Sequence, residues 1–334
     1  MRKSLAFIIG IATLGLAAPA WAQTPTLTVY TYSSFTADWG PGPAIKDAFE
    51  AECGCRLEWV SVDDGVTLLS RLRLEGRNSK ADVVLGLDMN LVSEARATGL
   101  FAPHGVDLSH LSLPVAWEDE LFVPFDYGYF AFVYDKTRLE DPPAGLADLV
   151  GGDPDQKIVI EDPRTSTPGL GLLLWMKKVY GDEAADAWRR LRPRILTVTK
   201  GWSEAYGLFL EGEAPMVLSY TTSPAYHIHT EGEHKYAAAQ FEEGHYLQVE
   251  VAARVASSDV PELAKRFLEF VVSPGFQSAI PTGNWMYPVI ELEGGLPPAF
   301  DTLVTPEESL LFPAETVAAN RDGWIDEWLR AMSQ

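Results

Sequence analysis

The residues of this sequence that could do chemistry stand just after short runs of strand-forming residues. Six such runs are followed by hydroxyl, carboxyl or aromatic side chains, namely Thr31 and Tyr32, Asp63 and Asp64, Asp88, Ser166 and Thr167, Trp202, and Tyr220, Thr221 and Ser223. In open α/β sheets, ligands bind beyond the carboxyl ends of the strands. The pattern therefore predicts a cleft in which hydrogen-bonding groups and aromatic faces surround a small molecule.

Each of these features also has a purely structural interpretation. Asp64 before Gly65 is typical of a capped helix start, and Ser166 before Thr167 and Pro168 fits an N-cap followed by a first-turn proline. Such a helix start also accepts phosphate oxygens. The aromatic residues can equally be core or surface side chains of the fold: Tyr32, Trp39, Trp202, Tyr226 and Trp285. It is the repetition over six strands that favours a binding site.

Signatures of catalysis and of metal binding are missing from the sequence. It contains no Gly-x-Ser-x-Gly, P-loop or His-Glu-x-x-His motif. The acid-rich surroundings of four histidines favour solvated loops over metal ligation: His227, His229, His234 and His245. We therefore expect no catalytic residue, no metal and no cofactor. A secreted hydrolase stays open as an alternative, because sequence does not set the distance between paired acids such as Asp63 and Asp64.

Strands and helices alternate along the chain and must position these residues. Runs at 27–30, 57–62 and 82–87 are typical of strands, and apolar residues at helical spacing lie between them. The same order restarts with strands at 158–160, 195–199 and 216–220. This alternation predicts an α/β fold with mostly parallel strands and helices on both faces of the sheet.

Two such units without a flexible linker predict two lobes joined by extended segments, and a length of 334 residues allows two domains. The expected crossings are the extended stretches at 122–134 and 246–255, and a helix at 261–272 is expected to return to the first lobe. The expected division is lobe 1 at 23–124 and 250–290, lobe 2 at 125–249, and a C-terminal helical segment at 291–334 that packs on lobe 2.

The first residues predict a secretory signal peptide at 1–22. Arg2 and Lys3 precede an apolar run that ends at Leu16, and Ala20-Trp21-Ala22 supplies the small-x-small cleavage pattern. The run is shorter than the ~20 apolar residues that a spanning helix needs. We therefore expect an exported chain that is cleaved after Ala22.

The net charge argues against polyanionic partners. The sequence has 26 Lys and Arg against 47 Asp and Glu, a net charge of −21, and removal of residues 1–22 deepens it to −23. Such a surface repels nucleic acid and anionic membranes, and it attracts small cations.

Cys53 and Cys55 are the only cysteines, and Gly54 separates them. Two nearby thiols usually pair in an oxidising compartment, and glycine gives a tight loop the backbone freedom it needs. Two thiolates without nearby histidines are a weak zinc signal. We therefore expect a local disulfide between Cys53 and Cys55.

Several long, aromatic-rich segments carry a resemblance to a known family. They are LTVYTY (27–32), ADWGPGP (37–43), NSKADVVLGLD (78–88), VPFDYGYFAFVYD (123–135), DPRTSTPGLG (162–171), TKGWSEAYGLFL (199–210), LSYTTSPAY (218–226) and GNWMYP (283–288). On these motifs the mature chain resembles the periplasmic thiamine-binding proteins of bacterial ABC importers. The resemblance implies a two-lobed type II periplasmic binding protein fold with a ligand cleft between lobes joined by a hinge.

The resemblance also implies a set of ligand contacts. The residues that match the family's contact motifs are Asp64 and Gly65, Ser166 and Thr167, Trp202, and Tyr220, Thr221, Thr222 and Ser223. Aromatic walls of the family's pocket match Tyr32, Tyr226 and Trp285.

The chemistry of thiamine accounts for these residue types, because thiamine joins a flat aminopyrimidine to a cationic thiazolium ring. We expect Tyr32 and Tyr226 to sandwich the pyrimidine while Asp64 accepts a hydrogen bond from its amine. Trp202 or Trp285 would attract the thiazolium by cation–π contact, worth about 0.5–2 kcal/mol. The hydroxyethyl arm, or the phosphate of thiamine monophosphate or diphosphate, is expected at the capped helix start.

The function implied is a monomeric periplasmic receptor without a catalytic role. It would capture thiamine or its phosphates, close its lobes over the ligand and deliver it to the membrane subunits of an ABC importer. A ferric-ion or polyamine binding protein of the same fold is the alternative, since ferric-ion binding proteins use adjacent tyrosinates. Here Tyr220 and Tyr226 are separated and flanked by Thr, Ser and Pro, which fits stacking better.

Overall fold

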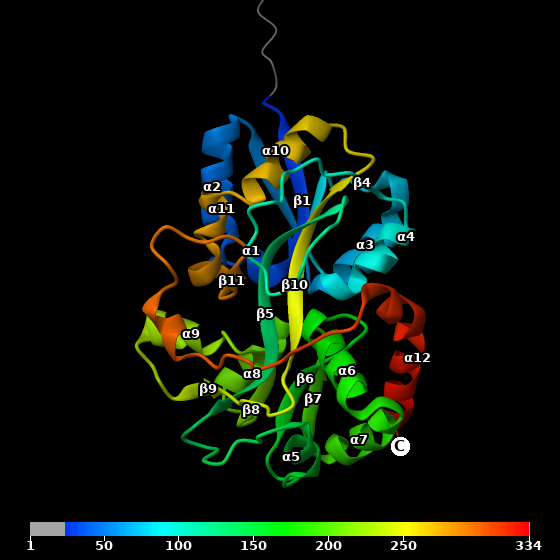
Figure 1. The fold of residues 1–334 in the computed structure, drawn as a ribbon, viewed down its shortest axis with the longest axis vertical. Helices are drawn as coiled ribbons and strands as arrows, with labels where there is room; N and C mark the ends of the chain where they lie inside the picture. Colours follow the sequence, from blue (N-terminus) through cyan, green and yellow to red (C-terminus); the bar gives the residue numbers. More distant parts are fainter. Residues whose placement is uncertain (1–23, 334) are drawn as a thin grey trace, which may run out of the picture.

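Two lobes of mixed α/β structure, stacked along the long axis, make up the computed structural model, which describes residues 24–333 (Figure 1). The strands are β1 (Thr26–Tyr32), β2 (Arg56–Val62), β3 (Val83–Asp88), β4 (Phe101–Ala102), β5 (Phe122–Asp135), β6 (Ile158–Glu161), β7 (Ile195–Thr199), β8 (Met216–Tyr220), β9 (Tyr236–Ala238), β10 (His245–Val255), β11 (Tyr287–Pro288) and β12 (Ser309–Leu310). The α-helices are α1 (Ser33–Thr36), α2 (Gly42–Cys53), α3 (Gly65–Glu75), α4 (Val92–Ala97), α5 (Leu146–Gly151), α6 (Thr167–Tyr180), α7 (Ala184–Leu191), α8 (Trp202–Leu210), α9 (Pro224–Tyr226), α10 (Pro261–Val271), α11 (Pro274–Gln277) and α12 (Ala314–Ser333). The predicted alternation of strands and helices is confirmed. The predicted signal peptide at 1–22 lies outside the described residues.

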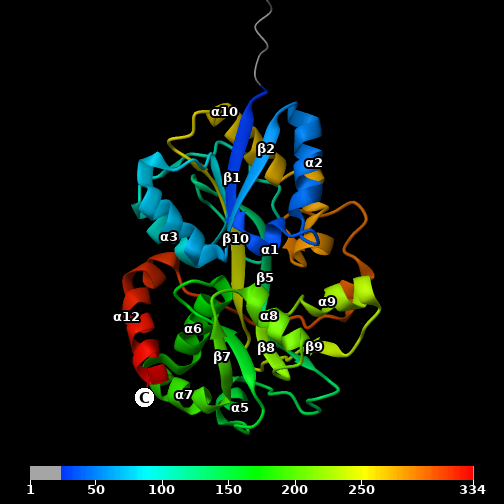
Figure 2. The same ribbon diagram turned by 180° about the vertical axis from the view of Figure 1, so that it is seen from behind.

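Lobe 1 is a sheet covered by helices on both faces (Figures 1 and 2). Its strand order is β2-β1-β3-β10-β5; β1 runs parallel to β2 and β3, and β10 runs antiparallel to β3 and β5. Alternate side chains of β1 enter different cores: Leu27 and Val29 pack with residues of α2, α10 and α11, whereas Tyr30 packs with residues of α3. Helix α10 thus returns to lobe 1, as predicted.

Lobe 2 repeats this architecture with the strand order β5-β8-β6-β7, in which β6 runs parallel to β7 and β8. Helix α6 begins with Ser166 as its N-cap and Pro168 in its first turn, and its leucines are buried in the core. Helix α8 covers the other face of the sheet, where its buried side chains pack with Ala131, Val159 and Val217. Strand β8 runs antiparallel to β5, which passes from lobe 1 into lobe 2, and β6 runs parallel to both β7 and β8, so the carboxyl ends of all three strands point toward lobe 1.

Strands β5 and β10 run side by side through both lobes (Figure 1). Residues 122–129 of β5 pair with β10, whereas residues 130–134 pair with β8 of lobe 2. The pairing of β10 with β5 carries a register shift between Glu250 and Val251, close to the place where the chain passes between the lobes. These strands are the two segments predicted to cross, and they form the hinge.

The C-terminal helix α12 bridges the lobes on the side away from β9. It contacts α6 and α7 of lobe 2 and also α4 of lobe 1. Lys177 of α6 lies 3.2 Å from Glu327, and Arg321 lies 3.4 Å from Glu94 of α4. The segment expected on lobe 2 therefore contacts lobe 1 as well.

A disulfide joins Cys53 to Cys55 at the end of α2. Gly54 between them has a φ of 62°, the left-handed conformation that glycine adopts readily at helix C-termini. Within residues 24–333, no helix combines the length and the apolar character needed to cross a membrane.

Candidate functional site

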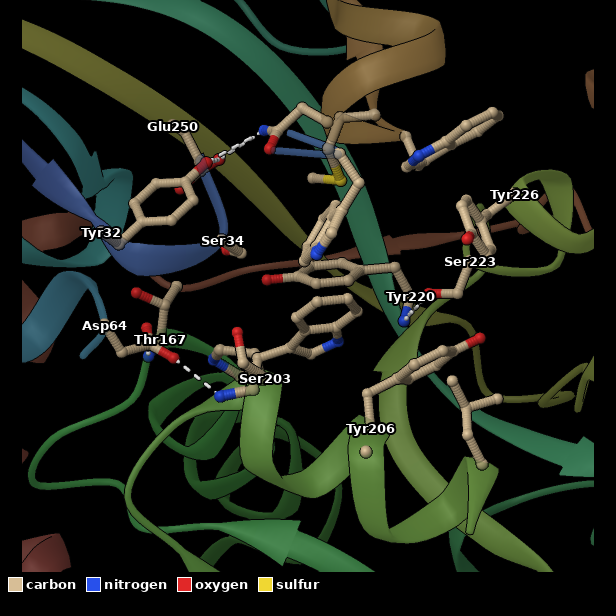
Figure 3. Close-up of a pocket in the computed structure, with 18 residues that line it drawn as sticks. Tyr32, Ser34, Asp64, Thr167, Ser203, Tyr206, Tyr220, Ser223, Tyr226 and Glu250 are labelled. Carbon is tan, nitrogen blue, oxygen red and sulfur yellow. Dashed lines mark hydrogen bonds between the residues drawn. The ribbon is translucent and has the colours of Figure 1, made fainter. Parts of the chain in front are cut away.

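A cavity of about 350 Å³ lies between the lobes, within the ~300–1,000 Å³ typical of ligand pockets. Figure 3 shows side chains from both lobes converging on it, with Tyr32 and Asp64 from lobe 1 facing Tyr206, Tyr220 and Tyr226 from lobe 2. Eight of the predicted contact residues line the cavity: Tyr32, Asp64, Thr167, Trp202, Tyr220, Ser223, Tyr226 and Trp285. Most of them follow directly on β1, β2, β6, β7 or β8, since the carboxyl ends of these strands meet at the cleft.

Four other predicted residues are absent from this lining: Gly65, Ser166, Thr221 and Thr222. Gly65 is explained by the space around it. A Cβ at this position would lie 2.4 Å from the Thr167 hydroxyl oxygen and 2.6 Å from the carbonyl oxygen of Gly86. Real Cβ atoms do not approach other atoms so closely, so glycine is what allows α3 to meet lobe 2.

The remaining three support the wall of the cavity. The Ser166 hydroxyl caps α6 by accepting a hydrogen bond from Gly169 N–H at 3.4 Å. Thr221 N–H donates to the carbonyl of Tyr129 at 2.9 Å, and the Thr222 hydroxyl lies 3.9 Å from the sulfur of Met286. By contrast, Asp88 does not reach the cleft; its buried carboxyl group accepts hydrogen bonds from Asn90.

Asp64 of lobe 1 links the two lobes through hydrogen bonds to lobe 2. Its Oδ1 accepts hydrogen bonds from Gly65 N–H at 2.7 Å and from Thr167 N–H at 2.9 Å, and its Oδ2 accepts one from Trp202 N–H at 3.1 Å. Thr167 and Trp202 begin helices α6 and α8 of lobe 2, so the carboxylate meets the positive ends of two helix dipoles. Burial raises the pKa of the Asp64 carboxyl, whereas the three backbone N–H groups and the Ser166 hydroxyl lower it.

Further contacts hold the lobes together beside Asp64. The N–H and the hydroxyl of Thr67 in α3 both donate to the carbonyl of Thr165, each at 3.1 Å. At the exposed rim, Lys200 of lobe 2 lies 3.7 Å from Asp63 of lobe 1. The structure is therefore a closed form, with the lobes in direct contact.

Aromatic rings form the walls of the cavity. The Trp202 indole stacks on Tyr206 with ring centroids 4.9 Å apart, and its N–H donates to the Ser219 hydroxyl at 2.7 Å. Trp285 meets Tyr226 edge-to-face at 5.5 Å. These contacts fix the orientation of each ring in the closed form.

Trp285 is held in an unusual backbone conformation. Its φ of 55° is the one positive value among the non-glycine residues that the structure describes. Such a conformation costs free energy and is concentrated at functional sites. The indole N–H of Trp285 is buried and has no hydrogen-bond partner within residues 24–333. A polar group that is buried next to a cavity and lacks a partner can donate to a ligand.

Buried acids surround the back of the cavity. Asp64, Asp126, Glu161 and Glu250 are each less than a tenth exposed. Burial raises the pKa of the Tyr220 hydroxyl, and the charges of all four acids raise it further. No Lys, Arg or His side chain of the described residues lines the cavity. The charged side chains that line the cavity are therefore the acids Asp64 and Glu250.

Sequence reasoning missed several lining residues. Tyr206 lies four positions after Trp202, so helical spacing could have placed it on the same face. Glu250 is a single acid inside a long apolar strand, which is itself a signal of function or of a partner. Asn284 and Met286 lie in the GNWMYP segment and flank Trp285 in the lining, but no local pattern assigned them a contact.

The prediction that the histidines lie in solvated loops is wrong for His227 and His245, which are buried. His227 hydrogen-bonds the Tyr206 hydroxyl at 3.0 Å and Glu231 at 2.7 Å, so it positions a cavity residue. Such packing is set by tertiary contacts that acid-rich neighbours in sequence do not reveal. Within residues 24–333, no three His, Cys, Asp or Glu side chains are grouped to hold a metal ion.

Comparison with known proteins agrees with this architecture. Residues 78–315 match the family model described as bacterial extracellular solute-binding protein. The thiamine-binding periplasmic proteins of Salmonella typhimurium and Escherichia coli are each 62% identical to the chain, over 95% of its length and 96% of theirs. A solved structure of a periplasmic thiamin binding protein superimposes with a TM-score of 0.92 at 61% identity, covering 96% of this chain and 100% of that one.

A more distant structural neighbour shares the fold but is named for a different ligand. The ferric binding protein from Campylobacter jejuni superimposes with a TM-score of 0.75 at 20% identity, over 91% of this chain and 99% of its own. At that identity the likeness shows the fold alone. The high identity to the first group extends over almost the whole chain. The chain therefore belongs to the bacterial extracellular solute-binding protein family and, within it, to the group of the thiamine-binding periplasmic proteins.

Proposed function

We propose that this protein captures thiamine in the cleft between its lobes and delivers it to the membrane subunits of an ABC importer. The observation that carries the proposal is the lining of the cavity, where aromatic rings come from both lobes and the charged groups are the acids Asp64 and Glu250. A flat aromatic cation gains from stacking, from cation–π contact and from nearby carboxylates. Thiamine has this chemistry, and relatives that are 62% identical are named for binding it.

The proposal includes thiamine monophosphate and diphosphate as ligands. The hydroxyethyl arm of thiamine, or its phosphate, would lie at the end of the cavity where α6 and α8 begin. Thr167 and Ser203 line this end, and the buried Thr167 hydroxyl has no hydrogen-bond partner within the described part of the chain. Hydroxyl groups at helix starts are suitable donors for an alcohol or phosphate oxygen.

The proposal also covers the state and place of the protein. It acts as a monomeric receptor without catalysis, exported to the periplasm by the signal peptide at 1–22. The periplasmic fraction should then hold a chain that begins at Gln23, as read by mass spectrometry. Light scattering should give the mass of one chain, and thiamine should be recovered unchanged after long incubation with the protein.

The decisive experiment is a titration of ligand-free protein. We expect protein that is unfolded, dialysed and refolded to bind one thiamine per chain in calorimetry, with quenching of tryptophan fluorescence because Trp202 and Trp285 line the cavity. Thiamine monophosphate and diphosphate should compete, whereas ferric ion and spermidine should not. A flat titration with thiamine, or displacement of thiamine by ferric ion or spermidine, would contradict the proposal.

A further inference from the structure

Two buried acids face each other at the hinge. Asp126 of β5 and Glu250 of β10 are directly paired across the two strands. Asp126 is fully buried and Glu250 is 5% exposed, and of these two only Glu250 lines the cavity. The register of β10 against β5 shifts just after Glu250. Such irregularities re-aim side chains and are common next to functional sites.

A set of donors holds this pair in place. The Tyr32 hydroxyl donates to Oε2 of Glu250 at 2.7 Å. The side-chain amide of Asn284 donates to Oδ2 of Asp126 at 2.6 Å, to the Tyr32 oxygen at 2.9 Å and to Oε2 of Glu250 at 3.4 Å. Figure 3 shows Tyr32 and Glu250 directed toward each other at one end of the cavity. Tyr32 and Asn284, from two separate segments, thus hold Oε2 of the Glu250 carboxyl group.

Among residues 24–333, no basic group is a cause of the pKa shift of either acid. The charged and titratable groups that act on Glu250 are Asp126, Asp64 and the hydroxyl of Tyr32, and Glu250 in turn acts on Tyr220. Burial raises the pKa of both Asp126 and Glu250. The negative charge of Asp126 raises the pKa of Glu250 further, because ionisation of one buried carboxyl group disfavours ionisation of its neighbour.

We propose that Glu250 is a specificity-determining residue, whose carboxyl group accepts a hydrogen bond from the ring amine of the ligand while Asp126, Tyr32 and Asn284 hold it in position. This inference rests on the proposed function. The amine was expected at Asp64, whose carboxylate is already engaged by three backbone N–H groups. Glu250 is the other acid that lines the cavity.

The hydrogen bonds around Glu250 allow a substitution that exchanges one acceptor for a donor and keeps the shape of the side chain. In Glu250→Gln, the donors of Tyr32 and Asn284 hold the amide oxygen where Oε2 now lies. The amide NH2 then takes the place of Oε1, so a donor replaces an acceptor there. An amine on the ligand would meet this donor unfavourably, whereas a carbonyl oxygen would accept from it.

The test compares thiamine with oxythiamine, in which oxygen replaces the ring amine. We expect the wild-type protein to bind thiamine at least about 10-fold more tightly than oxythiamine in calorimetry. Glu250→Gln should weaken thiamine binding about 10-fold or more and leave oxythiamine binding equal or tighter, so that the preference collapses. The matched control is Glu204→Gln, an exposed acid of α8 outside the cavity, which should leave both affinities within about twofold.

Two results would overturn the inference and leave the proposed function intact: a wild-type protein that binds both compounds equally, or an unchanged preference in Glu250→Gln. Failure of the wild-type protein to bind thiamine at all would instead remove the proposed function, and the inference with it. If Glu250→Gln does not unfold cooperatively, Tyr32→Phe takes its place. It removes the hydroxyl that orients Glu250 and keeps the ring, so it too should reduce the preference for thiamine.

Discussion

Asp64 offers the most direct test of how the lobes are held closed. In Asp64→Asn, the side chain keeps its shape, and its oxygen can still accept from Gly65 N–H and Thr167 N–H. The new NH2 group, however, takes the place of Oδ2 and faces Trp202 N–H, which is 3.1 Å from that oxygen in the wild type. The new NH2 group and Trp202 N–H are both donors, so the charge-assisted hydrogen bond between these positions is lost.

The size of the effect follows from these contacts. A hydrogen bond to a charged group contributes about 1.5–3 kcal/mol, and its replacement by an unpaired donor costs a similar amount. Loss of the Trp202 contact and of the charge facing two helix N-termini should therefore destabilise the closed form by about 2–3 kcal/mol. If the closed form is the one that binds, the dissociation constant for thiamine should rise roughly 30- to 150-fold.

Calorimetry with thiamine and small-angle X-ray scattering without ligand measure the two consequences. Asp64→Asn should bind more weakly and show a larger radius of gyration than the wild type. The control is Asp63→Asn, which removes the neighbouring acid; its ion pair with Lys200 is largely exposed, with side chains 60% and 73% accessible. Exposed pairs contribute at most about 1 kcal/mol, so this variant should stay within about fivefold of wild type. Equal affinities and equal scattering for the two variants would refute the reasoning.

Two further predictions concern stability. Gly65→Ala should lower the free energy of unfolding by about 1–3 kcal/mol, because its Cβ meets the Gly86 carbonyl at 2.6 Å. Its control is Gly323→Ala in α12, where the new Cβ has open space and should raise the free energy of unfolding by about 0.5–1 kcal/mol. Urea unfolding measures both variants. The same loss of stability in both would contradict the argument. Burial lowers the pKa of His245 from 6.5 to about 4, and its Nε2 accepts from Phe241 N–H at 3.0 Å. The unfolded chain therefore binds the proton first as pH falls, so the stability that neutral His245 contributes is complete above pH 6.5 and declines by about 3 kcal/mol toward pH 4. Denaturant unfolding across this range should show that decline in the wild type and not in His245→Gln, and parallel curves would count against it.

Much of the fold could be predicted because its signals are local. The residues of β7 and β8 form strands at the positions that their β-branched and apolar runs indicate. The cleft residues at strand ends could be found for a related reason. Parallel strands place their carboxyl ends at one edge, so a residue such as Tyr32, Asp64 or Trp202 needs only its place after a strand to be assigned there.

The roles of these residues depended on contacts that no local pattern contains. Asp64 looks like a helix cap and is one, but two of its three donors lie 103 and 138 residues away. His227 is buried because Tyr206 and Glu231 pack around it, although its neighbours in sequence are polar. An acidic neighbourhood in sequence therefore says little about the surroundings of a side chain in the fold.

The sequence by itself determined the alternation of strands and helices, the strand-end residues and the negative charge that favours a cationic ligand. Only the tertiary structure decided which acids lie together at the hinge and which hydrogen bonds hold them. Asp126 and Glu250 come together because β5 and β10 pair through the hinge, and Asn284 reaches both from a third segment. The physical reason is range: periodicity and caps act over a few residues, whereas the register of distant strands and the contact between lobes follow from packing of the whole chain.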